Sequence, residues 1–168
     1  MSDIRQGRMI VLVDDDETST SEGIVMVAAE YCDAFHVNFM ARQARGLVCL
    51  ALTRDRCEQL ELTSMVVGGS DKKPNFTTSI EAAKGIDTGI SAADRAHTIQ
   101  TAVASFASPA DIVQPGHVFP LMVASGGVLM RAGLTEAASD YAGLSGLAPA
   151  AVISDILSSK GELADKSQ

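Results

Sequence analysis

The sequence is poor in basic residues and lacks the segments that mark membrane or secreted proteins. Thirteen Lys and Arg face 21 Asp and Glu, the net charge is −8, and no run of Lys or Arg occurs. Because such a chain repels the phosphates of nucleic acids and anionic membranes, we expect neither as a partner. No stretch approaches the roughly 18 to 20 apolar residues of a transmembrane helix, and the polar start, residues 1–8, is unlike a signal peptide. These absences predict a cytoplasmic protein.

Several common site motifs are also missing. The three cysteines, Cys32, Cys49 and Cys57, are odd in number and lack CxxC spacing, which argues against a disulfide framework or a zinc site. We expect reduced thiols that are buried or half-buried. No dinucleotide-binding glycine pattern, P-loop or HExxH occurs. With 168 residues, of which 46% are hydrophobic and 20% charged, the chain is predicted to fold as one domain over residues 1–168.

Short apolar runs alternate with capped helical segments along the chain. Helices are expected after the caps Asp33, Thr53 and Ser91 and from Thr135, with Gly46 ending the first of them and Asp94 completing a capping box in the third. Strands are expected at 9–13, 24–29, 46–52, 76–82, 117–123, 127–130 and 150–157. The first is interpreted as buried on both faces. Interleaving without a repeat predicts a layered α/β or α+β domain.

Two glycine turns stand just before a helix and have an arginine close by. The first comprises Thr88, Gly89 and Ser91, with Asp94 and Arg95 in the following turn. The second comprises residues 131–136, with Arg131 upstream of the helix and Thr135 at its expected cap. Helix N-termini and arginines bind phosphate. A capping box with a surface arginine explains the first turn alone, whereas the two turns together favour an anion site in one cleft.

An acidic cluster and one histidine are the remaining candidates for chemistry. The cluster runs from Asp14 to Glu17, with Glu22 just beyond. Adjacent carboxylates repel one another, so they indicate a bound cation, a row of substrate hydroxyls or acid–base catalysis; a solvated surface turn is an equally good interpretation. His117 precedes an apolar strand. A hydrogen-bonding structural histidine is the commoner case there, and an acid–base group is the alternative.

Taken in order, several stretches resemble the 3,4-dihydroxy-2-butanone 4-phosphate synthase family over roughly residues 8–157. They are MIVLVDDDE, VMVAAEY, VNFMAR, RGLVCLALT, FTTSIEA, TGISAADRA, HTIQTAV, QPGHVFPL, GGVLMRAGLTEAA and GLAPAAVISDI. The resemblance implies a single α+β domain with helices around a mixed sheet. It also implies a homodimer with active sites near the subunit interface, and conversion of ribulose 5-phosphate to a four-carbon phosphate and formate.

The chain departs from the family pattern at the metal site. The family's acidic loop reads approximately DDEDRENEGD, and its arginine, metal-binding glutamate and last aspartate correspond here to Ser19, Thr20 and Ile24. The family's second protein ligand, a histidine, corresponds to Leu134. Leucine and a neutral hydroxyl cannot replace an imidazole and a carboxylate around a divalent cation. The resemblance therefore implies no cofactor, and Mg²⁺ only if the family reaction survives.

Other positions match the family. The implied catalytic residues are Asp15, Glu22, Cys49, His117 and Asp155, the last in place of the family's glutamate. The implied substrate- and phosphate-binding residues are Thr88, Gly89, Ser91, Asp94, Arg95, Arg131, Thr135 and Glu136. Compared with the family pattern, the chain is expected to lack a leading helix and a final helical segment, which would bear on the dimer.

We therefore expect a diverged member that binds a sugar phosphate and catalyses a metal-independent enolisation or dehydration, for which a base and an acid suffice. The family reaction itself and a non-catalytic sugar-phosphate-binding or regulatory protein are the alternatives.

Overall fold

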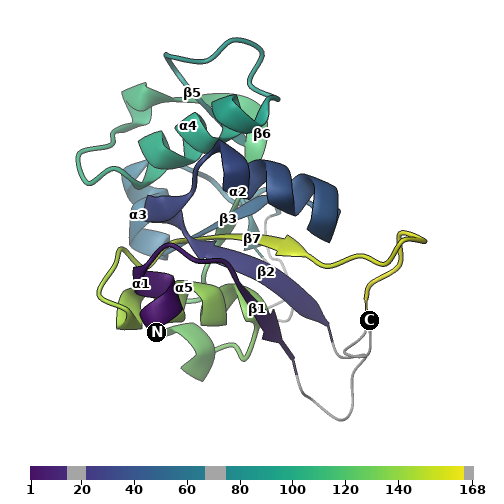
Figure 1. The fold of residues 1–168 in the computed structure, drawn as a ribbon. Coiled ribbons are helices and arrows are strands. Elements are labelled where there is room, and N and C mark those ends of the chain that lie inside the picture. The colour runs from purple at the N-terminus through teal and green to yellow at the C-terminus, as the bar shows by residue number, and fades with distance from the viewer. Residues whose placement is uncertain (15–21, 67–74, 165–168) are drawn as a thin grey trace.

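The structure is a computed structural model and describes residues 1–14, 22–66 and 75–164 (Figure 1). The helices are α1 (Ser2–Arg5), α2 (Ala34–Phe39), α3 (Arg54–Gln59), α4 (Ala92–Val103) and α5 (Leu134–Leu144). Short 3-10 or π segments are η1 (Ala29–Tyr31), η2 (Met40–Ala44), η3 (Pro109–Asp111) and η4 (Gly127–Leu129). The strands are β1 (Ile10–Val13), β2 (Gly23–Ala28), β3 (Cys49–Leu52), β4 (Asn75–Phe76), β5 (Ile80–Ala82), β6 (Ile112–Met122) and β7 (Ala151–Asp155).

The strands form a mixed sheet in the order β1-β2-β7-β3-β6-β4, with β5 paired to β6. The β3–β6 pair is parallel and the other pairs are antiparallel. Every residue of β2 and β3 is buried, as expected for continuous apolar runs at the centre of a sheet. This arrangement confirms the α+β class with a mixed sheet.

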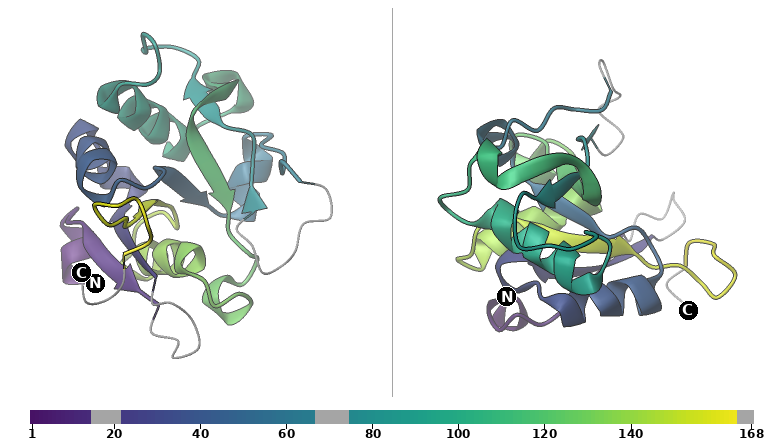
Figure 2. Two further views of the ribbon diagram at one scale, coloured as in Figure 1. Left: turned by 90° about the vertical axis from the view of Figure 1, so that its right-hand side faces the viewer. Right: turned by 90° about the horizontal axis from the view of Figure 1, so that it is seen from above.

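The two faces of the central strands pack against different helices. Because side chains alternate along a strand, neighbouring residues contribute to opposite faces. One apolar cluster joins α2 and α4 to the sheet through Val25, Val27, Leu50, Leu52 and Val152. The other joins α5 through Ile24, Met26, Cys49, Ala151 and Ile153. The sheet therefore separates α2 and α4 from α5 (Figures 1 and 2).

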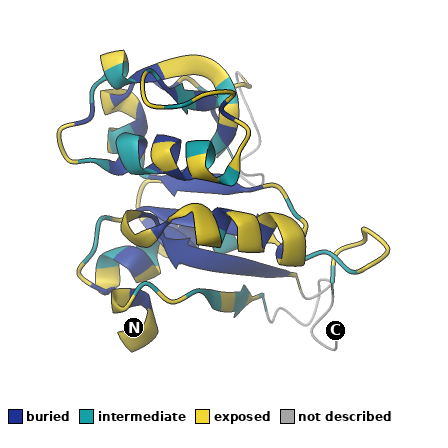
Figure 3. Cartoon of the chain, turned by 45° about the horizontal axis from the view of Figure 1, so that its top comes forward, coloured by how far each residue is buried: buried dark blue, intermediate teal, exposed yellow. Residues whose placement is uncertain are grey.

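Two strand predictions are wrong in their details. β1 lies at the edge of the sheet and alternates in burial, with Val11 56% and Val13 40% exposed, so it is not buried on both faces. Residues 127–130 are not a strand but contain η4, because Gly126 and Gly127 have φ values of +95° and +62°, which an extended strand does not use. Figure 3 shows the buried central strands and the mixed burial of this edge.

Other element boundaries shift. The predicted strand at 76–82 is divided into β4 and β5, and the pairing of β5 with β6 is irregular between Ile80 and Glu81. Helix α2 continues into η2 and ends at Arg45, which has a φ of +68°, so Gly46 is not its terminator. Gly46 is required for another reason, since a Cβ there would overlap the backbone of Asp155.

Candidate active site

His117 is held by a glutamate from the neighbouring strand. Its Nδ1 is hydrogen-bonded to Oε1 of Glu81, which lies on β5, while His117 lies on β6. The Glu81 side chain is only 16% exposed, and that of His117 is 44% exposed. An ionised carboxylate only accepts hydrogen bonds, so the imidazole donates from Nδ1. This places a sheltered carboxylate behind a half-exposed imidazole.

The glycine turn at residues 87–91 packs directly on this pair. Gly89 is buried with a φ of +79°, and a Cβ there would overlap Oε1 of Glu81. Thr88 and Ser91 are exposed. The turn therefore requires glycine both for its backbone conformation and for the space that Glu81 occupies.

The start of α4 is capped as predicted, except for Asp94. Ser91 is the N-cap, and its Oγ accepts a hydrogen bond from the Asp94 N–H at 3.0 Å. The Asp94 carboxylate does not complete the expected capping box. It accepts the Gly89 N–H at 3.1 Å instead, so this N–H is already engaged by an acidic side chain. Asp94 thereby ties the turn to the helix.

Arg95 is not the surface arginine of the simple capping interpretation. It is half-buried, and its Nε is fully buried with no hydrogen-bond partner. Burial lowers the pKa of this guanidinium from its ordinary value. A buried guanidinium N–H without an acceptor is uncommon in native proteins.

A second cluster surrounds the start of α5. Nη2 of Arg131 lies 2.5 Å from Oε1 of Glu136, whose side chain is fully buried. The same oxygen accepts the Ala124 N–H at 3.0 Å, whereas Oε2 of Glu136 has no partner. A Cβ on Gly133 would lie 2.7 Å from Oε2. The buried carboxylate therefore orients the guanidinium of Arg131.

The cap of this helix differs from the prediction. Helix α5 begins at Leu134 with Gly133 as its N-cap, and no side chain caps it. Thr135 lies inside the first turn and is buried. The predicted hydroxyl cap is wrong because Gly133 occupies the N-cap position. A side chain at Gly133 would not fit, since its Cβ would lie 2.7 Å from Oε2 of Glu136.

The third group of predicted residues lies at the sheet beside α5. Cys49 is 5% exposed, and burial, with Asp155 adding to it, raises the pKa of its thiol to about 12. Desolvation also raises the pKa of Asp155, an exposed residue at the end of β7. Ile24 is paired with Asp155 across β2 and β7. Glu22 is exposed just before β2, and Asp15 and Thr20 lie outside the described residues.

The two helix starts do not open into one cleft of a single chain. Helix α4 belongs to the face covered by α2, and α5 packs on the opposite face. Figures 1 and 2 show the two helices on opposite sides of the sheet. The expectation of a single anion-binding cleft is therefore not met within one chain.

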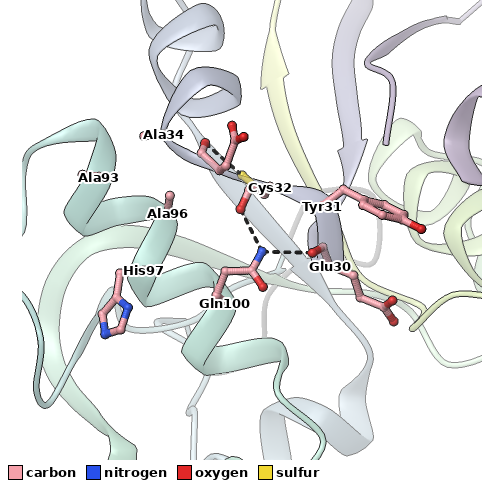
Figure 4. Close-up of a pocket in the computed structure, with 9 residues that line it drawn as sticks. Glu30, Tyr31, Cys32, Ala34, Ala93, Ala96, His97 and Gln100 are labelled. Atoms are coloured by element: carbon pink, nitrogen blue, oxygen red, sulfur yellow. Dashed lines mark hydrogen bonds between the residues drawn. The ribbon is translucent and has the colours of Figure 1, made fainter. Parts of the chain in front are cut away.

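A surface groove of about 490 Å³ lies between η1, the start of α2 and α4 (Figure 4). It contains none of the predicted site residues. Nε2 of Gln100 donates to the carbonyls of Ala29, Glu30 and Cys32 at 2.9, 3.2 and 2.8 Å. These hydrogen bonds tie α4 to η1, so the polar atom at the centre of the groove serves the fold.

A family model described as 3,4-dihydroxy-2-butanone 4-phosphate synthase matches residues 1–168. The chain belongs to this family. A synthase from Pseudomonas aeruginosa is 52% identical over 165 residues, which are 98% of this chain and 45% of that protein. One from Photobacterium phosphoreum is 50% identical over 169 residues, covering 100% of this chain and 46% of that protein. The chain thus spans about half the length of these relatives.

Solved structures of synthases have the same fold. A two-domain synthase from A. baumannii has a TM-score of 0.93 and 51% identity, covering 99% of this chain and 49% of that one. A synthase described in complex with two magnesium ions has a TM-score of 0.87 and 37% identity, with 93% and 73% covered. The family resemblance of the sequence and its α+β fold are both confirmed.

The described residues at the metal position that the resemblance implies do not suit Mg²⁺. Leu134, which the family resemblance aligns with a histidine ligand, packs on the apolar cluster of Ile24, Met26 and Cys49. Ile24, which the resemblance aligns with an aspartate, is 2% exposed. Neither side chain offers an oxygen or nitrogen donor. Within residues 1–14, 22–66 and 75–164, no three His, Cys, Asp or Glu side chains are grouped as metal ligands would be.

Sequence analysis missed Glu81 as a site residue. The alternation of residues 76–82 indicates only that Glu81 faces away from the core. Its partner His117 is 36 residues away. No local pattern connects the two, because β5 and β6 meet only in the folded sheet.

Among the helices of the described residues, none has both the length and the apolar character of a membrane span.

Proposed function

We propose that this synthase-family chain binds ribulose 5-phosphate, or a closely related sugar phosphate, and acts on it by acid–base chemistry without a protein-bound metal ion. One observation carries the proposal. The family's phosphate-binding arginine is retained and oriented at Arg131, whereas Leu134 and Ile24 make the family's metal end apolar. Loss of the ligands with retention of the anion-binding groups favours chemistry that needs only a base and an acid.

Arg131 and the start of α5 are the proposed phosphate site. Glu136 holds the guanidinium from within the protein, and a planar guanidinium binds phosphate through two parallel hydrogen bonds. Helix α5 is 11 residues long, so its dipole and first N–H groups also favour an anion at its start. Thr135 belongs to the same turn.

His117 is the proposed base. With Nδ1 bound to Glu81, Nε2 of the neutral ring can accept a proton from the carbon next to the substrate carbonyl. We assign the donation of a proton to the enolate oxygen to Asp155 at the end of β7, whose pKa desolvation raises. Glu22 and Cys49 are the other candidates near this end, and the buried thiol of Cys49 stays protonated. The step moves one proton off carbon and one onto oxygen, so its balance needs no oxidant.

The proposal includes a homodimer. The turn at residues 87–91 and the Arg131 cluster precede helices α4 and α5, which pack on opposite faces of the sheet of one chain. We therefore propose that a complete site takes groups from two copies. We also infer that residues 1–168 form one domain, and that it acts in the cytoplasm, where sugar phosphates are metabolised.

The family reaction, conversion of ribulose 5-phosphate to 3,4-dihydroxy-2-butanone 4-phosphate and formate, is the second candidate. It is favoured by 50% to 52% identity to synthases over nearly the whole chain. It would require Mg²⁺ ligands other than those at positions 20 and 134.

Incubation with ribulose 5-phosphate in D₂O, with Mg²⁺ or with a chelator, separates the two candidates. We expect deuterium incorporation or a new phosphorylated product in the chelator, observed by ¹³C and ³¹P NMR, without formate. Formate release that requires Mg²⁺ would establish the family reaction instead. Binding of the sugar phosphate in calorimetry without any turnover would identify a non-catalytic binding protein.

A further inference from the structure

We propose that Glu81 is a positioning residue, which holds His117 as the tautomer protonated on Nδ1 and so keeps Nε2 as the proton acceptor. The inference deepens the proposed function, in which His117 is the base. It concerns a residue that lies 36 positions from His117 in the chain and meets it only through the β5–β6 pairing.

The chemistry of the contact determines the tautomer. Nδ1 of His117 lies against Oε1 of Glu81, and a carboxylate at neutral pH has no proton to donate. The ring proton must therefore be on Nδ1. In the described residues no protein group is bonded to Nε2 of His117, and the side chain is 44% exposed. Nε2 is thus the nitrogen that a substrate can reach.

Glu81 is confined on two sides by glycines. A Cβ on Gly89 would overlap Oε1 of Glu81, and a Cβ on Gly116 would lie 2.5 Å from its Cγ. Gly116 is anchored in turn by its N–H, which donates to Ser79 Oγ at 3.1 Å. Asp94 holds the Gly89 N–H from the other side. Because Gly89 and Gly116 both contact Glu81 through their backbone, the carboxylate has little freedom to move away from the imidazole.

A second histidine, His97, provides an internal reference because its hydrogen bond requires the opposite ring tautomer. Nε2 of His97 lies 3.0 Å from the carbonyl oxygen of Lys84. A carbonyl only accepts, so His97 must carry its proton on Nε2. Of the three histidines of the chain, His117 and His97 are therefore expected to show opposite tautomers in the same spectrum.

The test is a long-range ¹H–¹⁵N spectrum of the histidine rings at a pH where they are neutral, recorded on the full chain. We expect His117 to be protonated on Nδ1 and His97 on Nε2. Glu81→Ala should convert His117 to a mixture of tautomers and leave His97 unchanged. Glu81→Gln, which has the same shape and so preserves the packing against Gly89, should shift His117 in the same direction, because an amide can either donate or accept.

Turnover is measured on the same variants. We expect kcat to fall about ten-fold or more, with KM within about two-fold, because a misplaced proton removes the base without removing the phosphate contacts. Asp33→Asn is the matched control: Asp33 also contacts a histidine, His36, but caps α2. Asparagine caps helices equally well, so this variant should keep full activity.

The outcomes are distinguishable. An Nε2-protonated His117 in the parent protein, or an unchanged tautomer in both Glu81 variants, would overturn the inference. So would an unchanged kcat in an active protein whose tautomer has shifted. If the parent does not turn over any sugar phosphate, the proposed function fails, while the ring spectrum still decides the positioning by Glu81.

Discussion

Replacing Arg131 with alanine is predicted to weaken both ligand binding and the fold. The Glu136 carboxylate is fully buried, and its Oε1 is shared between Arg131 Nη2 and the Ala124 N–H. Without Arg131, a buried negative charge keeps the Ala124 hydrogen bond but loses its counter-ion. Breaking a buried ion pair by removing one partner typically costs about 3 to 5 kcal/mol. Since the Arg131 side chain is 17% exposed, we expect the lower end, about 3 kcal/mol.

The pair can be separated from the rest of the site with a double-mutant cycle. Glu136→Gln alone leaves a neutral amide of the same shape beside the arginine. The double variant, Arg131→Ala with Glu136→Gln, has no uncompensated charge. It should therefore be more stable than Arg131→Ala alone, with a coupling energy of about 1 to 3 kcal/mol.

The assay is urea unfolding at 25 °C, monitored by circular dichroism, with comparison of midpoints at equal m values. Sugar-phosphate affinity is measured in parallel by calorimetry. Arg131→Ala should bind about ten-fold more weakly or worse, because a charge-assisted contact contributes roughly 1.5 to 3 kcal/mol. Arg131→Lys should recover only part of that affinity, since it offers a point charge rather than a fork.

Two results would refute this reasoning. A stability of Arg131→Ala within about 0.5 kcal/mol of the parent, the range of neutral surface changes, would mean that Arg131 does not compensate Glu136. Unchanged affinity for sugar phosphate would mean that Arg131 is structural and that the anion binds elsewhere.

Three further predictions concern the positions that the resemblance aligns with metal ligands, the Asp155 carboxyl and the cysteine thiols. The double change Thr20→Glu with Leu134→His should create Mn²⁺ binding, detected by paramagnetic relaxation, that neither single change produces; no difference from the parent would contradict the alignment of the acidic loop. The pKa of Asp155 is higher in the folded protein than in the unfolded chain. The protonated carboxyl therefore favours folding at acid pH, and this stabilisation is lost as the pH rises through the folded-state pKa. Asp155→Asn should therefore stabilise the protein at pH 7 relative to the parent, with the difference shrinking below pH 4 in urea melts; a constant difference would contradict it. The three cysteines, with pKa values raised to about 12 by burial, should resist iodoacetamide at pH 8 until the protein unfolds, as intact-mass measurements would show.

The sequence by itself determined the features whose physical cause is local. Asp33, Thr53 and Ser91 each cap a helix as predicted, because the side-chain oxygen bonds an N–H only three residues further on. The apolar runs of β2, β3 and β7 were readable because strands at the centre of a sheet are buried on both faces. The family was recognisable because its motifs keep their order along the chain.

The tertiary structure alone decided which of these pieces meet. An apolar run does not record whether its strand lies at the edge, so the exposure of β1 depended on where the sheet ended. Glu81 contacts His117, 36 residues further along the chain, and Leu134 packs against the apolar cluster that contains Ile24 on the same face of the sheet. The separation of α4 from α5 follows from side-chain alternation in strands that both helices share. Such contacts arise from the pairing of distant strands, for which neighbouring residues in the sequence carry no local signal.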